Sequence, residues 1–174
     1  MRMRMLSLIR FGLLFSVTVL FSACATMGGE TKPTPAPDFT IKMLNGGEVS
    51  LAQYKGRPLM ICVGATWCPH CLHEAPIFKK IHEKYKDRLG MLGVLIKSKP
   101  EDAEALVKKE GLGFDMALDP DNEFAKAYNV KGIPAIFIIN SEGMIVDEDV
   151  GGMEYDEIVK RVDKLLATAP PAGK

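Results

Sequence analysis

Two cysteines spaced as Cys-x-x-Cys carry the clearest chemical signal in the sequence. Cys68 and Cys71 stand in the segment Trp67-Cys68-Pro69-His70-Cys71, directly after the apolar run at 58–64. Thiol–disulfide exchange needs one thiolate that attacks a disulfide and a second thiol that resolves the mixed disulfide. At the start of a helix, free N–H groups and the helix dipole favour negative charge on the first cysteine. We therefore predict that Cys68 is the nucleophile and that Cys71, one turn deeper and less exposed, is the resolving thiol.

The two residues between the cysteines fit this chemistry. Pro69 suits an early helical position, because its missing N–H has no partner there. His70 can stabilise the Cys68 thiolate by charge or by a hydrogen bond. A stabilised thiolate favours the reduced form, which makes the disulfide a stronger oxidant.

A zinc site and a structural disulfide are the alternatives for this motif. The sequence has four cysteines, which are too few for a disulfide scaffold. Zinc usually takes four ligands, and only His70, His73 and Cys62 can join the pair. We predict redox use, with no metal and no cofactor, and interpret Cys62 as a small buried hydrophobe; a third redox thiol is the alternative.

An export signal and a lipid attachment site are predicted at residues 1–24. Residues 1–23 combine three arginines with an uncharged run from Phe11 to Ala23, shorter than the roughly 20 residues of a spanning helix. The small residues before Cys24 resemble the bacterial lipobox, in which the cysteine is lipidated and becomes the first residue; Phe21 departs from the usual leucine. An uncleaved anchor or an ordinary cleavage site are the alternatives. All three place the domain outside the cytoplasm, in the periplasm or on the cell surface.

The remaining chain is predicted to contain a linker, one domain and a tail. Residues 24–37 are rich in Gly, Pro and Thr and cannot form a core face, and 169–174 read as a flexible tail. Residues 38–168 form the domain. Without the leader, 19 basic residues face 22 acidic ones, a net charge of about −3. A net negative charge gives no electrostatic attraction to phosphate backbones, so we predict no nucleic acid partner.

Alternating buried and amphipathic patterns predict an α/β domain with a mixed sheet. A hairpin is expected around Asn45-Gly46-Gly47. Strand–helix–strand units imply parallel pairing, and a short turn makes the last two strands antiparallel, with helices on both faces of the sheet. Pro76 should kink the first helix or shift its start, and Ser98 should open the second. Four strands are expected, at 58–64, 89–96, 134–139 and 144–149. Four helices are also expected: one after Cys68, one at 100–110, a short one that ends at Tyr128, and a last one that carries Ile158 to Leu166.

The cysteine motif after a buried strand, with Gly132-Ile133-Pro134 later in the chain, resembles the thioredoxin fold. Further segments resemble the TlpA/ResA-like branch over about residues 37–167: Pro37-Asp38-Phe39, Leu51 with 54–58, Glu74 and Pro76 after Cys71, Asp119-Pro120 and 140–143. This resemblance implies a thioredoxin fold with an N-terminal β-hairpin extension. It also implies a membrane-tethered extracytoplasmic protein that reduces disulfides of exported proteins, among them apocytochrome c.

The resemblance also implies roles for four residues. Pro134 is expected to be cis and to lie against the cysteines, which leaves the backbone of Ile133 free to pair with substrate. Trp67 is expected to shield the motif, and Glu74 to exchange protons with Cys71. From the sequence alone, a trans proline, a core tryptophan and a solvated glutamate are the respective alternatives.

Two features depart from the family pattern. Many thioredoxins carry a buried acid six residues before the first motif cysteine, where this chain has Cys62. Because that acid is absent, Glu74 becomes the main candidate for proton exchange with Cys71. The Pro69-His70 dipeptide resembles that of the oxidant DsbA, whose helical insertion this chain lacks, so scaffold and dipeptide indicate opposite directions of electron flow.

We predict an extracytoplasmic thiol–disulfide oxidoreductase that acts as a reductant. Its expected partners are exported protein thiols and disulfides, a membrane or periplasmic electron donor, and the lipid membrane through Cys24. The alternatives are a DsbA-like oxidant, a non-catalytic lipoprotein that binds a metal or a partner, and a peroxidase, because Pro37-Asp38-Phe39 also resembles peroxiredoxins.

Overall fold

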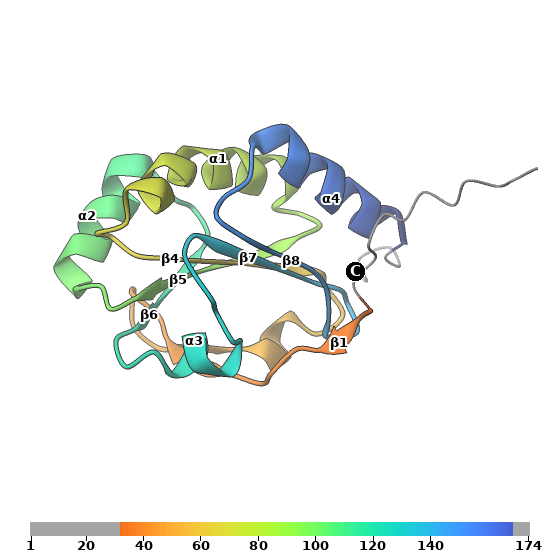
Figure 1. Cartoon of the computed structure of the whole chain (residues 1–174), viewed down its shortest axis with the longest axis horizontal. Coiled ribbons are helices and arrows are strands. Elements are labelled where there is room, and N and C mark those ends of the chain that lie inside the picture. Colours follow the sequence, from red (N-terminus) through yellow and green to blue (C-terminus); the bar gives the residue numbers. More distant parts are fainter. Residues whose placement is uncertain (1–31, 169–174) are drawn as a thin grey trace, which may run out of the picture. The chain divides into compact units, whose positions relative to one another are not determined.

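A mixed six-stranded sheet forms the centre of the computed structural model, which describes residues 32–168 (Figure 1). The strand order is β1-β8-β7-β4-β5-β6. β4, β5 and β6 run parallel, whereas β7 is antiparallel to both β4 and β8. The strands are β1 (Thr34–Pro35), β4 (Leu59–Gly64), β5 (Gly90–Ile96), β6 (Asp115–Asp119), β7 (Ala135–Ile139) and β8 (Met144–Val150).

Helices cover both faces of this sheet, as the sequence predicts. Figure 1 shows α1 (Pro69–Tyr85), α2 (Pro100–Glu110) and α4 (Tyr155–Thr168) on one face. The other face carries α3 (Glu123–Ala127), the hairpin of β2 (Thr40–Lys42) and β3 (Glu48–Ser50), and the 3₁₀ turn η1 (Leu51–Tyr54). The mixed α/β architecture and the hairpin extension are therefore confirmed.

The two faces of β4 explain why its sequence is a continuous apolar run. Met60 and Cys62 pack with α1 and α4, and Leu59, Ile61 and Val63 pack with the opposite layer. A strand that is covered on both sides needs apolar residues at every position. The strand is therefore fixed in the sheet at the point where the chain turns into the cysteine motif.

Two short strands lie where the sequence predicted none. Thr34 and Pro35 pair with Ile145 and Met144 at the edge of the sheet, so the sheet includes residues before the boundary expected at Asp38. A strand at the edge of a sheet pairs through its backbone groups and does not need apolar side chains. The composition of this segment therefore did not indicate a strand. The sequence did not predict β6 either, because Asp115 and Asp119 interrupt the apolar pattern at its two ends.

The start of α2 corrects a predicted cap. Lys99, not Ser98, is the N-cap residue. The Ser98 hydroxyl accepts a hydrogen bond from the Thr66 N–H at 3.0 Å and donates to the Ile96 carbonyl at 3.1 Å. Ser98 therefore connects β5 to the loop before the cysteine motif. Pro76 lies inside α1 and does not shift its start, which is at Pro69.

The predicted export signal, Cys24 and the tail at 169–174 lie outside the described residues. Within 32–168, no helix combines the length and apolar character needed to cross a membrane.

Candidate active site

The cysteine motif lies at the junction of β4 and α1. Cys68 is the N-cap residue of α1 with an extended backbone, and Pro69 is the first helical residue. The Cys71 N–H donates to the Cys68 sulfur at 3.3 Å, and the two residues form a disulfide with Cα atoms 5.3 Å apart. The first cysteine thus occupies the end of a 17-residue helix whose free N–H groups can stabilise a thiolate.

The exposure of the two cysteines differs from the expectation. Cys68 is only 5% exposed, whereas Cys71 is partly exposed. The first turn of α1 lies at the surface, and Pro69, His70 and Leu72 around Cys71 are all exposed. Cys71 therefore lies further along the helix than Cys68 without being more buried. The assignment of Cys68 as nucleophile depends on its position at the helix end.

Trp67 stands on the surface beside the disulfide. Its side chain is 58% exposed, and its indole N–H donates to the Lys97 carbonyl at 3.1 Å. This hydrogen bond and the one between Thr66 and Ser98 hold the loop before Cys68 against the turn that follows β5. The alternative of a core tryptophan is therefore contradicted.

The peptide bond between Ile133 and Pro134 is cis, as the resemblance implies. Pro134 is buried and lines a small cavity of about 40 Å³ together with Cys71 and Cys62. Ile133 is partly exposed and lines a surface hollow next to Trp67. The start of β7 and the cysteine motif, far apart in the sequence, are thus brought together.

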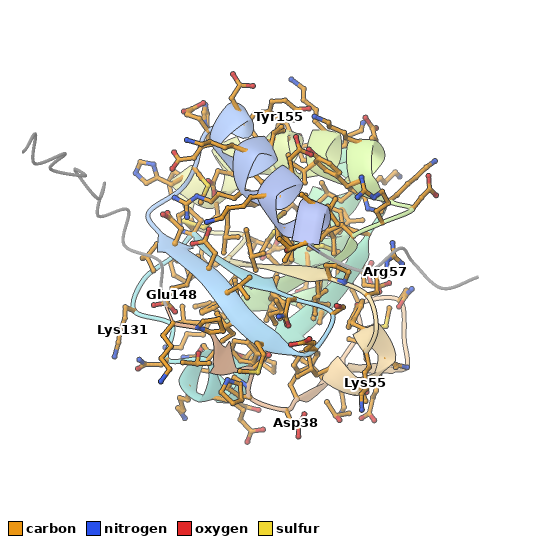
Figure 2. The ribbon with its side chains drawn as sticks, turned by 90° about the vertical axis from the view of Figure 1, so that its right-hand side faces the viewer. Asp38, Lys55, Arg57, Lys131, Glu148 and Tyr155 are labelled. Atoms are coloured by element: carbon orange, nitrogen blue, oxygen red, sulfur yellow. A yellow bond between two sulfur atoms is a disulfide. The ribbon has the colours of Figure 1, made fainter. Side chains whose placement is uncertain are left out.

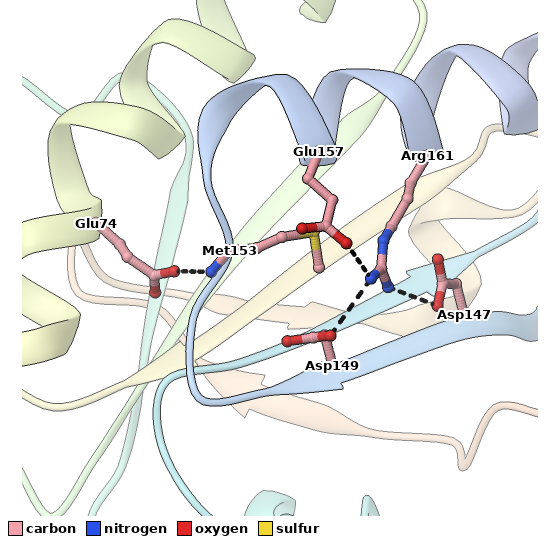
Figure 3. A network of polar contacts seen from close by, with 6 residues as sticks. All are labelled: Glu74, Asp147, Asp149, Met153, Glu157 and Arg161. Atoms are coloured by element: carbon pink, nitrogen blue, oxygen red, sulfur yellow. Dashed lines mark hydrogen bonds and ion pairs between the residues drawn. The ribbon is translucent and has the colours of Figure 1, made fainter.

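Glu74 is buried one turn below the disulfide, at 4% exposure. One carboxylate oxygen accepts the Met153 N–H at 2.6 Å (Figure 3), and the other is buried without a hydrogen-bond partner among the described residues. Burial raises the pKa of Glu74, and Asp149 adds to the effect, although the Met153 N–H opposes it. The solvated-glutamate alternative is contradicted.

Cys62 is a free, buried thiol on the face of β4 that packs against α1. Burial raises the pKa of Cys62 well above its usual range, and the negative charge of Glu74 raises it further. The thiol is therefore protonated at neutral pH and behaves as the small buried hydrophobe that was predicted.

Comparison with known proteins identifies the chain. Residues 33–148 match the AhpC/TSA family. The chain belongs to this family. Thioredoxin-like protein YneN of Bacillus subtilis is 32% identical over 131 residues, covering 74% of this chain and 76% of the relative. Thiol-disulfide oxidoreductase ResA of Bacillus thuringiensis is 27% identical over 167 residues, covering 88% and 96%.

A solved structure has a fold similar to that of this AhpC/TSA family member. The thiol:disulfide interchange protein of Chlorobium tepidum, a thioredoxin family protein, superposes with a TM-score of 0.72 at 25% identity, covering 79% of this chain and 99% of that one. The ResA-like relatives, the thioredoxin fold and the close cysteine pair together make the chain a thiol–disulfide oxidoreductase of the ResA type.

In this AhpC/TSA domain, the surroundings of Glu74 include residues that the sequence did not indicate. Met153 lies in the loop between β8 and α4, and a Cβ on the preceding Gly152 would come within 2.9 Å of the carboxylate. On α4, Arg161 contacts Asp147, Asp149 and Glu157 at 3.0, 3.4 and 2.8 Å (Figure 3), which fastens the helix to β8. The Glu157–Arg161 spacing is a local signal for part of this network. Nothing local in the sequence indicates Met153.

His70 is exposed at the helix tip and forms no hydrogen bond or ion pair within residues 32–168, so its tuning role stays a prediction. Among residues 32–168, no group of three or more His, Cys, Asp or Glu side chains is placed to hold a metal ion.

The raised pKa of Glu74 leads to a prediction about folding stability. The folded state favours the protonated carboxyl, so this stabilising contribution is complete below the usual glutamate pKa of about 4.3 and is lost as the pH rises through the raised pKa. We expect the free energy of unfolding of the wild type to fall relative to that of Glu74→Gln as the pH rises from about 4 toward neutrality. Urea unfolding of the oxidised proteins at several pH values measures the difference.

Glu83→Gln is the matched control, because Glu83 is exposed on the same helix. Its stability should follow the wild type at every pH. If Glu74→Gln also follows the wild type, Glu74 is ionised in the folded state as readily as a solvated glutamate.

Proposed function

We propose that this protein reduces disulfides of other proteins outside the cytoplasm through a Cys68–Cys71 dithiol. The observation that carries the proposal is the cysteine pair at the tip of α1, beside buried Pro134 and above buried Glu74. The same place in the molecule thus combines a stabilised thiolate, a resolving thiol and an acid.

The reaction follows from these positions. In the reduced protein, the Cys68 thiolate attacks a substrate disulfide and displaces one substrate thiolate, which takes up a proton. The Cys71 thiolate then attacks the Cys68 sulfur and displaces the second substrate thiolate. The substrate gains two electrons and the protein becomes the observed Cys68–Cys71 disulfide. A dithiol electron donor of the membrane or periplasm restores the reduced state.

Glu74 is proposed to accept the proton of Cys71 during the second step. Its second carboxylate oxygen is buried without a partner, and its raised pKa brings it closer to the range in which proton exchange with a thiol is effective. Gly152 links the two sites, since a Cβ there would contact both the Glu74 carboxylate and Pro134, which lines the cavity with Cys71. An unchanged dependence of the resolving rate on pH in Glu74→Gln would remove this role.

Trp67, Ile133 and Pro134 are proposed to form the surface on which the substrate lies. Trp67 and Ile133 line one hollow, and Pro134 lines the small cavity together with Cys71. The backbone of Ile133 would pair with an extended substrate segment, in the manner of strand addition.

The direction of electron flow has a direct test. We expect the reduction potential of the Cys68–Cys71 pair to lie near −270 mV, the region of a thioredoxin-like reductant. It can be measured by equilibrating the domain with dithiothreitol mixtures and following the fluorescence of Trp67, the only tryptophan. A value near −120 mV would instead make the protein an oxidant, as its Pro69-His70 dipeptide suggests. Failure to exchange with any dithiol or disulfide would favour a non-catalytic binding role.

The location and the substrate are proposed from the sequence. The basic and apolar leader supports export with a lipid on Cys24, a linker after it, and a catalytic domain held near the membrane. The acyl chains would appear in the intact mass of detergent-extracted protein. Apocytochrome c is the proposed substrate, and rapid reduction of an oxidised Cys-x-x-Cys-His peptide would support it over a general reductant.

A further inference from the structure

Two surface hollows lie on either side of Trp67. The first, of about 490 Å³, is bordered by Trp67, Leu72 on α1 and Lys97 after β5. The second, of about 480 Å³, is bordered by Trp67, Ile133 and the segment that contains α3. Trp67 therefore forms a ridge between two hollows, directly beside Cys68.

Lysines dominate the charge of both hollows. Lys97, Lys99 and Lys109 line the first, where Asp102 is the single acid, and Lys126 and Lys131 line the second without an acid. All five lysines are exposed, and Lys131 projects outward from the surface (Figure 2). No carboxylate of residues 32–168 forms an ion pair with Lys97, Lys99 or Lys126. These charges stand out, because the chain without its leader carries a net charge of about −3.

Backbone strain is concentrated in the same hollows. Within the described residues, only Lys97, Asn122 and Asn129 have a positive φ without being glycine, and all three line the hollows. Asparagine tolerates this conformation, but lysine does so at an energetic cost, and residues held in this way cluster at binding sites. Asn122 also carries a side-chain oxygen that is buried without a hydrogen-bond partner among the described residues.

We propose that these two hollows bind an extended segment of the substrate protein that carries Asp or Glu residues on both sides of its reactive cysteine. An extended chain advances about 3.3 Å per residue, so side chains two or three positions from the cysteine reach the hollows. Their carboxylates meet the lysines, and the backbone crosses Trp67. The inference rests on the proposed function and adds the chemical class of its substrates.

The test compares short peptides that differ only in charge. Each carries one central cysteine as a mixed disulfide with 2-mercaptoethanol, flanked at positions −3, −2, +2 and +3 by Glu, Gln or Lys. The reduced protein is mixed with each peptide in a stopped-flow instrument, and Trp67 fluorescence reports formation of the new disulfide. We expect the Glu peptide to react about five to ten times faster than the Gln peptide at low ionic strength, and less than about twice as fast at 0.5 M salt.

A variant with one charge removed from each hollow makes the test specific. In Lys99→Gln/Lys126→Gln, the ratio of the Glu-peptide rate to the Gln-peptide rate should fall to about two or less. The matched control is Lys80→Gln/Lys160→Gln, which removes two exposed lysines of α1 and α4 that line neither hollow and should keep the wild-type ratio. Using the ratio cancels any general change in the reactivity of Cys68.

Equal rates for the Glu, Gln and Lys peptides, or the same ratio in the Lys99/Lys126 variant as in the wild type, would overturn the inference alone. The small uncharged 2-hydroxyethyl disulfide separates this result from a failure of the chemistry. If the protein reacts neither with that compound nor with any peptide, the proposed function fails and the inference fails with it.

Discussion

Replacing Cys68 with alanine is expected to slow reduction of 2-hydroxyethyl disulfide by at least about a thousandfold. Cys68 caps α1, where free N–H groups are expected to stabilise its thiolate, and no other described thiol has this position. Cys71→Ala should behave differently, because it retains the attacking thiolate but cannot resolve the product. That variant should react once and stop at a mixed disulfide. Stopped-flow rates and intact mass measure the two outcomes.

Cys62→Ala is the control for the loss of a thiol. Cys62 is buried on β4, and burial raises the pKa of this thiol, so we expect it to take no part in exchange. We expect its exchange rate to stay within about twofold of the wild type. If Cys71→Ala were inert while Cys68→Ala still formed a mixed disulfide, the two roles would be reversed. The partial exposure of Cys71 makes this comparison informative.

Ile81→Ala is expected to lower the free energy of unfolding by about 2–5 kcal/mol. Ile81 lies on α1 with no exposed surface and packs in the core cluster that contains Met60, Ile136 and Ile158. Truncation removes apolar contacts and leaves a cavity between α1 and the sheet. Because α1 positions both cysteines and Glu74, its packing also supports the active site. Urea unfolding of the oxidised variant measures the loss.

Lys80→Ala is the matched control, since Lys80 is the preceding residue of the same helix and is exposed. It should change the free energy of unfolding by no more than about 0.5 kcal/mol. A loss below about 1 kcal/mol in Ile81→Ala would mean that the core between α1 and the sheet rearranges to fill the space, contrary to the packing described above.

Pairing between distant strands limited what the sequence could predict about the fold. The apolar run of β4 and the helical spacing of Phe78, Ile81 and Tyr85 are local patterns, and the structure confirms both elements. β1 pairs with β8 more than a hundred residues away, and its two residues, Thr34 and Pro35, have no strand pattern of their own. Ser98 looked like a helix cap because it precedes Pro100, but its hydroxyl is used by Thr66 instead.

The sequence by itself determined the chemistry, because the spacing of Cys68 and Cys71 before a helix is a local property of the chain. It also identified Glu74 and Pro134 as candidates through resemblance. Only the tertiary structure decided the surroundings of these groups. The bond between Glu74 and Met153 joins residues 79 positions apart, and the lysines beside Trp67 come from three separate segments. Such contacts depend on how sheet and helices pack, and neither spacing nor composition carries that information.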